Sequence, residues 1–170
     1  MVDPADLVER LLRLVRRTVG ERISISTAVE GEAWPVRVDP SQMENAILNL
    51  VTNARDAMDG EGRLVIRCAA FDGQAALAVP GLAAGEYVCT EVEDNGCGMT
   101  DEVRERAFEP FYTTKPVGQG TGLGLSQVYG FVKQSGGHVV VASAPGEGTR
   151  VRLYLPRAAA AALQPAQAVA

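Results

Sequence analysis

The amino-acid sequence predicts an α+β fold, a two-layer sandwich with helices on one side and a sheet on the other. Three long stretches repeat apolar residues every three or four positions, as amphipathic helices do. Other runs, such as "RLVIRCAAF" and "EYVCTEVED", have the composition of strands. Because most of these strands are joined by hairpins rather than by helices, we expect helices and sheet to form separate layers.

The first half of the chain alternates helix and strand. Residues 5–19 carry two apolar rows at helical spacing, and "ISISTAV" (23–29) then alternates as a strand does. "EGE" makes a turn before the strand-like "WPVRVD" (34–39). The sequence Asp-Pro-Ser at 39–41 is a helix-start signal, and spaced apolar residues predict a helix over 41–58 that glycines close.

The second half contains most of the expected sheet. Strands over 63–71 and 86–94 are joined by an Ala/Gly/Pro-containing loop. A short helix near 101–106, a Gly/Thr/Pro-rich segment and a helix over 122–135 follow. A closing hairpin of "HVVVAS" and "TRVRLYLP" turns at Pro145-Gly146. We expect one domain over 1–157 and a disordered tail over 158–170.

Composition narrows the class of protein. The chain has 170 residues, of which 46% are hydrophobic, as in a globular domain. A net charge of -5 argues against nucleic-acid binding. Three cysteines without metal-ligand spacing favour reduced thiols and no zinc site. Together with the lack of a signal peptide or membrane-spanning stretch, they lead us to expect a cytoplasmic domain.

Two asparagines, Asn49 and Asn53, lie four positions apart and therefore project from one face of the 41–58 helix. Paired asparagines on a helix are usually structural. Here apolar neighbours surround them, so each carboxamide needs a partner. A carboxamide oxygen is a suitable ligand for Mg²⁺.

A D-x-G-x-G pattern, Asp94, Gly96 and Gly98, follows the 86–94 strand. Glycines let a backbone approach a flat ligand, and the carboxylate can accept a hydrogen bond from the exocyclic amine of adenine. The carbonyl of guanine at the same place would be repelled. Alone this pattern is weak, because Asp-Asn-Gly is also a frequent turn.

Glycines at 118, 120, 122 and 124 lead into the 122–135 helix in "GQGTGLGLS", which indicates an anion cradle at a helix start. A flexible hinge is the alternative. The order of residues is neither a Walker A motif nor a Rossmann fingerprint, and the protein-kinase motifs are missing. The preceding segment "AFEPFYTTKPVGQG" has the length and composition of a mobile lid.

The order of these motifs, ending in "GTRVRLYLP", resembles the catalytic domain of bacterial sensor histidine kinases in the GHKL (Bergerat) superfamily. The likeness covers residues 5–156 and includes the N, G1, F, G2 and G3 boxes. It implies a mixed sheet packed against helices, a mobile ATP lid and binding of ATP with Mg²⁺. The segment "GTGLGLSQVYGFVKQSGG" is most similar in sequence to hybrid kinases.

By this resemblance each motif acquires a role. Asp94 binds the adenine amine, with Gly96, Gly98 and Met99 shaping the base pocket. Asn53 ligates Mg²⁺, and Asn49 lies beside the γ-phosphate. The phosphates are held by residues of the glycine-rich segment and the lid: Lys115, Gly120, Thr121, Gly122, Leu123, Gly124 and Leu125. We therefore expect Asn49 and Lys115 to be the catalytic residues.

The residue types at two positions predict the reaction. ATP-hydrolysing members of the superfamily carry a glutamate where this chain has Asn49, and a carboxamide is a poor base, so hydrolysis should be slow. The single histidine, His138, begins a predicted strand and is expected to be a half-exposed strand residue rather than a phosphoacceptor. By resemblance, the acceptor histidine lies on a separate dimerisation domain.

The resemblance also implies partners. The γ-phosphoryl group would pass to the dimerisation domain and then to a response-regulator receiver domain. The isolated domain would be a monomer and its parent a homodimer, with any membrane anchor in other segments of the parent. Cell-cycle hybrid kinases further imply control by cyclic di-GMP, with Tyr129 as a stacking residue; alternatively Tyr129 flanks the core row of its helix. The rival functions are a GHKL ATPase or anti-sigma-type serine kinase and a degenerate nucleotide-sensing module.

Overall fold

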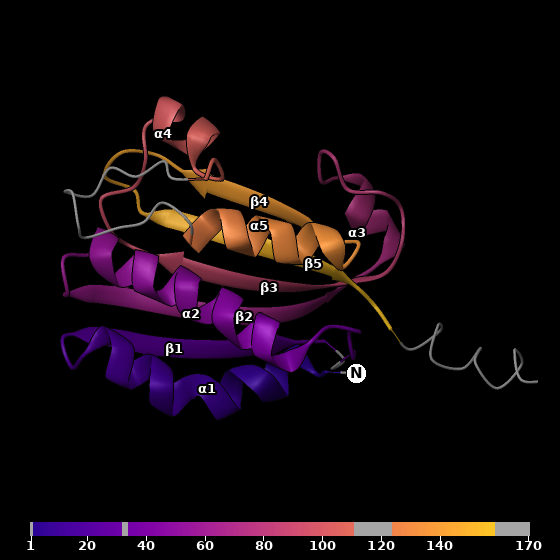
Figure 1. Ribbon diagram of the computed structural model, residues 1–170, viewed down its shortest axis with the longest axis horizontal. Coiled ribbons are helices and arrows are strands. Elements are labelled where there is room, and N and C mark those ends of the chain that lie inside the picture. Colours follow the sequence, from indigo (N-terminus) through magenta and orange to yellow (C-terminus); the bar gives the residue numbers. More distant parts are fainter. Residues whose placement is uncertain (1, 32–33, 111–123, 159–170) are drawn as a thin grey trace, which may run out of the picture.

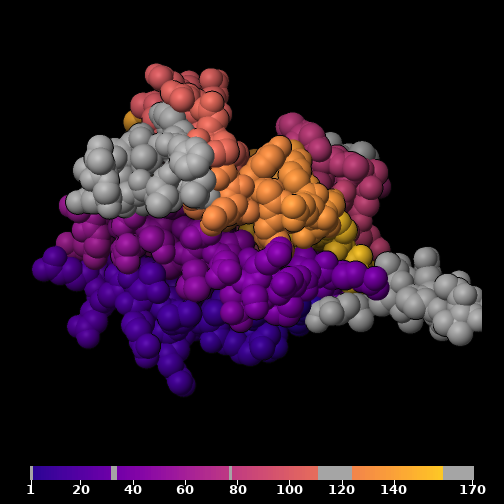
Figure 2. All heavy atoms as spheres, in the orientation of Figure 1, coloured from indigo at the N-terminus to yellow at the C-terminus, as the bar shows by residue number. Residues whose placement is uncertain are grey.

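Three helices cover one face of a five-stranded sheet in the computed structural model, which describes residues 2–31, 34–110 and 124–158 (Figure 1). The helices are α1 (Pro4–Val19), α2 (Pro40–Ala57) and α5 (Gly124–Gln134). This two-layer arrangement confirms the predicted α+β fold. Figure 2 shows the atoms of α5 lying directly against those of α2.

The sheet is mixed, with the strand order β1-β2-β3-β5-β4. Its strands are β1 (Ile23–Glu30), β2 (Gly62–Phe71), β3 (Tyr87–Asp94), β4 (His138–Ser143) and β5 (Thr149–Pro156). β1 and β2 are parallel because α2 crosses between them, and the other neighbours are antiparallel. The central strand β3 therefore ends at the same end of the sheet as the turn between β4 and β5.

The core lies between the helices and the inner face of the sheet. Alternate residues of β2, β3 and β5 are buried there, including Leu64, Ile66, Val92 and Leu153. Each of α1 and α2 begins with an aspartate cap followed by proline, so both helices start at defined points. The core thus fixes the helices over the strand ends that carry the predicted motifs.

Two expectations about local structure are wrong. Residues 34–39 form no strand; only Val36 makes isolated bridges, to Val2 and Arg157, and Pro35 beside it has no N–H to donate. The loop after β2 contains a helix, α3 (Gly73–Leu77), that the sequence analysis did not predict. Its start is capped by Asp72, whose carboxylate accepts a hydrogen bond from the Ala75 N–H at 2.9 Å.

The outer face of the sheet is covered differently at its two ends. At one end the α3 segment packs on a small apolar cluster that includes Ala76, Leu82 and Tyr154. At the other end the buried Glu91 carboxylate pairs with Arg67 and with Arg152. None of the described helices is both long and apolar enough to cross a membrane.

Candidate functional site

The two predicted asparagines lie where α2 meets the start of α5. A methyl group added to Gly124 would lie 3.8 Å from Asn53 Nδ2 and 3.9 Å from Asn49 Cγ. Both asparagines are half-buried, and no described residue hydrogen-bonds to either carboxamide. Neither asparagine has a buried side-chain oxygen or nitrogen that lacks a partner, so these carboxamides are open to solvent beside the N-terminal end of α5, where an anionic ligand is favoured.

Asp94, the last residue of β3, is buried with 8% of its surface exposed. Its Oδ1 accepts the N–H of Gly96 at 2.8 Å. Burial raises the pKa of this carboxyl, while hydrogen bonds from the backbone N–H groups of Gly96 and Thr149 oppose the rise. Two backbone donors therefore fix the orientation of the carboxylate and leave acceptor capacity on it.

The glycines after Asp94 are required by packing within the chain. A methyl group on Gly96 would lie 2.6 Å from the carbonyl of Ala57, at the end of α2. A methyl group on Gly98, whose φ is +70°, would lie 1.9 Å from the carbonyl oxygen of Ala144. The loop is thus pressed between α2 and the β4–β5 turn, a reason for glycine that the sequence analysis did not foresee.

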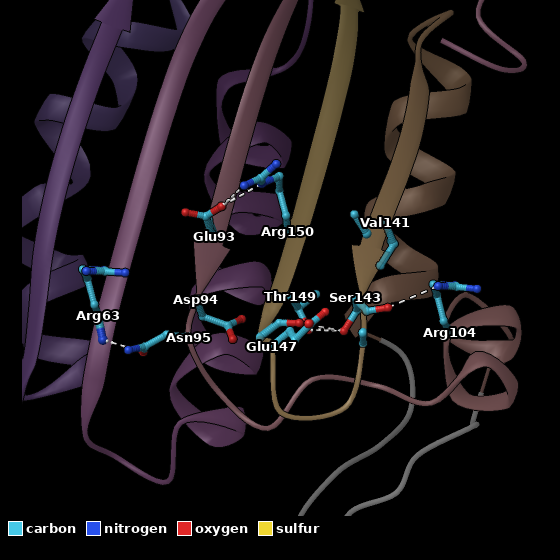
Figure 3. Close-up of a pocket in the computed structure, with 13 residues that line it drawn as sticks. Arg63, Glu93, Asp94, Asn95, Arg104, Val141, Ser143, Glu147, Thr149 and Arg150 are labelled. Carbon is cyan, nitrogen blue, oxygen red and sulfur yellow. Dashed lines mark hydrogen bonds and ion pairs between the residues drawn. The ribbon is translucent and has the colours of Figure 1, made fainter.

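Two hydroxyl residues that the sequence analysis missed complete this end of the sheet. Asp94 pairs with Thr149 across β3 and β5, and Ser143 pairs with Thr149 across β4 and β5. Ser143 Oγ lies 2.9 Å from Thr149 Oγ1 (Figure 3). The same oxygen accepts the backbone N–H of Met99 at 2.8 Å. The threonine directly after the Gly-x-Gly turn was the available sequence signal.

A cavity of about 650 Å³ opens at the same edge of the sheet (Figure 3). Its lining includes Glu93 and Arg150, which form an ion pair. Among the described site candidates only Asp94 reaches it, and neither Asn49 nor Asn53 does. The lining includes Glu93 and Arg150 from the outer face of the sheet and Asp94, Ser143 and Thr149 from the face that the helices cover, so the cavity extends around the ends of the strands.

Several predicted site residues lie outside the described residues: Lys115, Gly120, Thr121, Gly122 and Leu123. The predicted lid falls largely in the same segment. Of the remaining members of the glycine-rich motif, Gly124 begins α5 and Leu125 packs against the core. The described part of the site therefore consists of α2, the end of β3 with its loop, the β4–β5 turn and the start of α5.

His138 is a half-buried residue at the start of β4, as predicted. Its Nε2 lies 3.1 Å from the carbonyl oxygen of Pro80, and its Nδ1 lies 3.0 Å from Lys133 Nζ. Nε2 must donate to the carbonyl and Nδ1 must accept from the ammonium, so the ring is neutral. Burial and the nearby Lys133 charge both lower its pKa.

Comparison with known proteins identifies the family of the chain. Residues 38–159 match the family described as histidine kinase-, DNA gyrase B-, and HSP90-like ATPase. The sensor kinase CckA of Brucella abortus is 42% identical over 92% of this chain, which spans 17% of that protein. The two-component sensor PprA of Pseudomonas aeruginosa is 38% identical over 94% of this chain, and the match covers 17% of PprA.

Solved structures give the same result. The mycobacterial sensor histidine kinase MprB superposes with a TM-score of 0.72 at 28% identity, covering 92% of this chain and 95% of that one. Full-length ShkA in complex with AMPPNP superposes with a TM-score of 0.74 at 27% identity, and the match covers 92% of this chain and 30% of the ShkA chain. These matches show that the chain belongs to the histidine kinase-, DNA gyrase B- and HSP90-like ATPase family, as a homologue of sensor histidine kinases.

Proposed function

We propose that this domain binds Mg-ATP and donates the γ-phosphoryl group to a histidine on a separate dimerisation and phosphotransfer domain, in two-component signalling. The observation that carries the proposal is the meeting of three features at one end of the molecule. These are the Asp94 carboxylate, the carboxamides of Asn49 and Asn53, to which no described residue hydrogen-bonds, and the N-terminal end of α5 at Gly124. AMPPNP, an ATP analogue, is bound in the related ShkA structure.

Asp94 recognises the base in this proposal. Its free acceptor capacity suits the exocyclic amine of adenine, while the loop of Gly96, Gly98 and Met99 forms the wall beside it. The triphosphate then extends toward α5, where backbone N–H groups of the helix start favour negative charge. Residues of the glycine-rich segment, Gly120–Leu125, together with Lys115, hold the phosphates.

Asn53 provides the oxygen ligand for magnesium. Its carboxamide lies close to Gly124 and has no hydrogen-bond partner among the described residues, so an oxygen is available for a hard cation. When bound, Mg²⁺ neutralises phosphate charge during phosphoryl transfer. Asn49, one turn earlier, orients the γ-phosphoryl group with Lys115, and since a carboxamide cannot act as a base, water is not activated there.

The acceptor must come from another domain. Both ring nitrogens of His138 are already engaged, by Pro80 and Lys133, so this ring does not present a free nucleophile. We place the acceptor histidine on a helical dimerisation domain of the same protein, a homodimer, and the next acceptor on a response-regulator receiver domain. The isolated catalytic domain is then a cytoplasmic monomer. The parent, of hybrid type, can be anchored to the membrane through other segments.

Tyr129 on α5 is the proposed contact for cyclic di-GMP. Its side chain is 41% exposed, and one side of its ring is packed against Phe108 at 5.2 Å between centroids. Lys133 Nζ lies 5.5 Å from the ring centroid, where a cation can neutralise a phosphate. An exposed ring beside a cation suits stacking of a guanine base. A Tyr129→Asp variant should lose cyclic di-GMP binding in calorimetry; wild-type affinity would remove this proposal.

Calorimetry with ATP and Mg²⁺ tests the nucleotide site. Asp94→Ala should abolish measurable binding, because the buried acceptor is lost, and Asn53→Ala should remove the magnesium dependence of binding. Asn45→Ala is the matched control, since Asn45 is an exposed asparagine on the same helix. Equal affinities in wild type and both site variants would show that nucleotide does not bind here.

Transfer is tested by adding a purified dimerisation domain of a related kinase with [γ-³²P]ATP. Acid-labile label should appear on the added domain and not on His138. Rapid phosphate release would instead indicate an ATPase, and label on a protein serine an anti-sigma-type kinase. Binding without any transfer would indicate a nucleotide-sensing module.

A further inference from the structure

Ser143 stands at one end of a row of polar side chains that crosses three strands. Thr149 pairs with Asp94 on one side and with Ser143 on the other, so the three residues lie next to one another on one face of the sheet (Figure 3). Asp94 shares its side of β3 with the buried core residue Val92, so the row belongs to the face that the helices cover. The row therefore borders the proposed base site.

The hydrogen bonds of Ser143 determine where its proton points. A serine hydroxyl has one proton to donate and two lone pairs to accept with. Ser143 Oγ lies 2.8 Å from the carbonyl oxygen of Gly148, which can only accept, so the proton is used there. The N–H of Met99 occupies one lone pair at 2.8 Å. The remaining lone pair faces Thr149 Oγ1 at 2.9 Å.

Thr149 must consequently donate its own hydroxyl proton to Ser143. Its Oγ1 is then left with acceptor capacity only, directly beside the carboxylate of Asp94 in the row. A ligand group that faces this pair meets acceptors alone. An exocyclic amine satisfies them, whereas a carbonyl such as O6 of guanine meets repulsion from both residues.

We infer that Ser143 is a positioning residue that sets nucleobase selectivity: by taking the Thr149 proton it makes the Asp94–Thr149 pair an acceptor-only surface that selects an amino-substituted purine. This inference rests on the proposed nucleotide site and adds a determinant of base choice to it. The same serine oxygen holds the Met99 N–H, and its backbone carbonyl accepts from Arg104 Nη1 at 3.1 Å. Ser143 therefore also fixes the wall of the base pocket and ties helix α4 (Asp101–Arg106) to the sheet.

The test compares the dissociation constants of ATP and GTP, each with Mg²⁺, for wild type and Ser143→Ala. Removing the serine hydroxyl frees the Thr149 proton, which can then rotate to donate to a carbonyl. We expect the GTP-to-ATP ratio of dissociation constants to fall about tenfold, with ATP itself bound more weakly. Ser143→Thr retains the hydroxyl and should restore the wild-type ratio.

Ser135→Ala is the matched control. Ser135 is also half-buried and donates its hydroxyl proton to a backbone carbonyl, that of Phe131 at 2.9 Å, but it lies at the opposite end of α5. The Ser135→Ala variant should leave the GTP-to-ATP ratio of dissociation constants unchanged, even if its melting temperature falls. Thr149→Val, which removes the acceptor itself, should lower the ratio as Ser143→Ala does and serves if that variant does not fold.

The possible results are separable. An unchanged GTP-to-ATP ratio in a folded Ser143→Ala or Thr149→Val variant would overturn the selectivity inference and leave the proposed function intact. If the wild-type chain binds neither nucleotide, the proposed function itself fails. A fall in the ratio for Ser135→Ala as large as for Ser143→Ala would show that general destabilisation, and not the proton of Thr149, is responsible, and would also overturn the inference.

Discussion

Replacement of Gly98 by alanine measures how closely the loop after β3 is packed. The φ of Gly98 is +70°, and an added Cβ would lie 1.9 Å from the carbonyl oxygen of Ala144 and 3.1 Å from that of Gly148. The left-handed backbone costs an alanine about 1 kcal/mol. Both close neighbours are backbone atoms, which cannot rotate away, so relief requires movement of the β4–β5 turn, at about 1–3 kcal/mol.

We therefore expect Gly98→Ala to lower the free energy of unfolding by about 2–4 kcal/mol, a large part of a typical domain's stability. The assay is urea denaturation at 25 °C followed by circular dichroism, with the free energy taken from the midpoint and slope. The N–H of Gly146 in this turn also donates to the carbonyl oxygen of Cys97 at 2.7 Å. Movement of the turn therefore displaces the loop of the proposed base pocket, and ATP binding should weaken in parallel.

Gly146→Ala separates the two contributions. Gly146 has nearly the same backbone conformation, with φ +78°, but no atom lies within 4 Å of an added Cβ. Its replacement should cost only the backbone part, about 1 kcal/mol. If Gly98→Ala costs no more than Gly146→Ala, the loop after β3 does not lie this close to the β4–β5 turn in solution, and the packing requirement for glycine at position 98 is refuted.

Three further predictions concern titratable groups. A thiol reagent at pH 8 should label one cysteine rapidly, the exposed Cys97, because burial raises the pKa of the other two to about 11 and about 12; fast labelling that survives Cys97→Ser would contradict this. The pKa of His138, followed by NMR of its ring protons, should lie below 6.5 in the folded protein, and Lys133→Met should raise it. In the wild type the unfolded chain binds more protons than the folded chain as the pH drops below about 6.5, so the free energy of unfolding should fall there. Glu91→Gln should lower the free energy of unfolding, measured by urea denaturation, by about 1–2 kcal/mol. The change removes the buried carboxylate that pairs with Arg67 and Arg152, and the loss is moderate because both arginines are partly solvated. Asp6→Asn, at an exposed pair, should change stability by under about 0.5 kcal/mol, and equal losses at the two sites would contradict the difference in burial.

Local sequence signals were reliable where one segment determines its own structure. Asp39 caps α2 through the N–H of Ser41, and the hairpin of β4 and β5 turns where Pro145-Gly146 predicted. Helix α3 was missed because its five residues are too few to show a helical period, and its residue Ala76 lies in a cluster with the distant Tyr154. The strand expected over 34–39 is not formed: Val36 makes only isolated bridges, to Val2 and Arg157, and Pro35 has no N–H to donate.

The sequence alone determined helices α1, α2, α4 and α5, the five strands and the identity of the motif residues, since periodicity and capping act over a few positions along the chain. Only the tertiary structure brought Asn49 and Asn53 against Gly124 and aligned Asp94 with Thr149 and Ser143. Cross-strand register depends on how whole strands pack, and a hydroxyl proton's direction depends on every partner around it. For that reason Ser143, which no motif marked, became visible as a determinant of the site only in three dimensions.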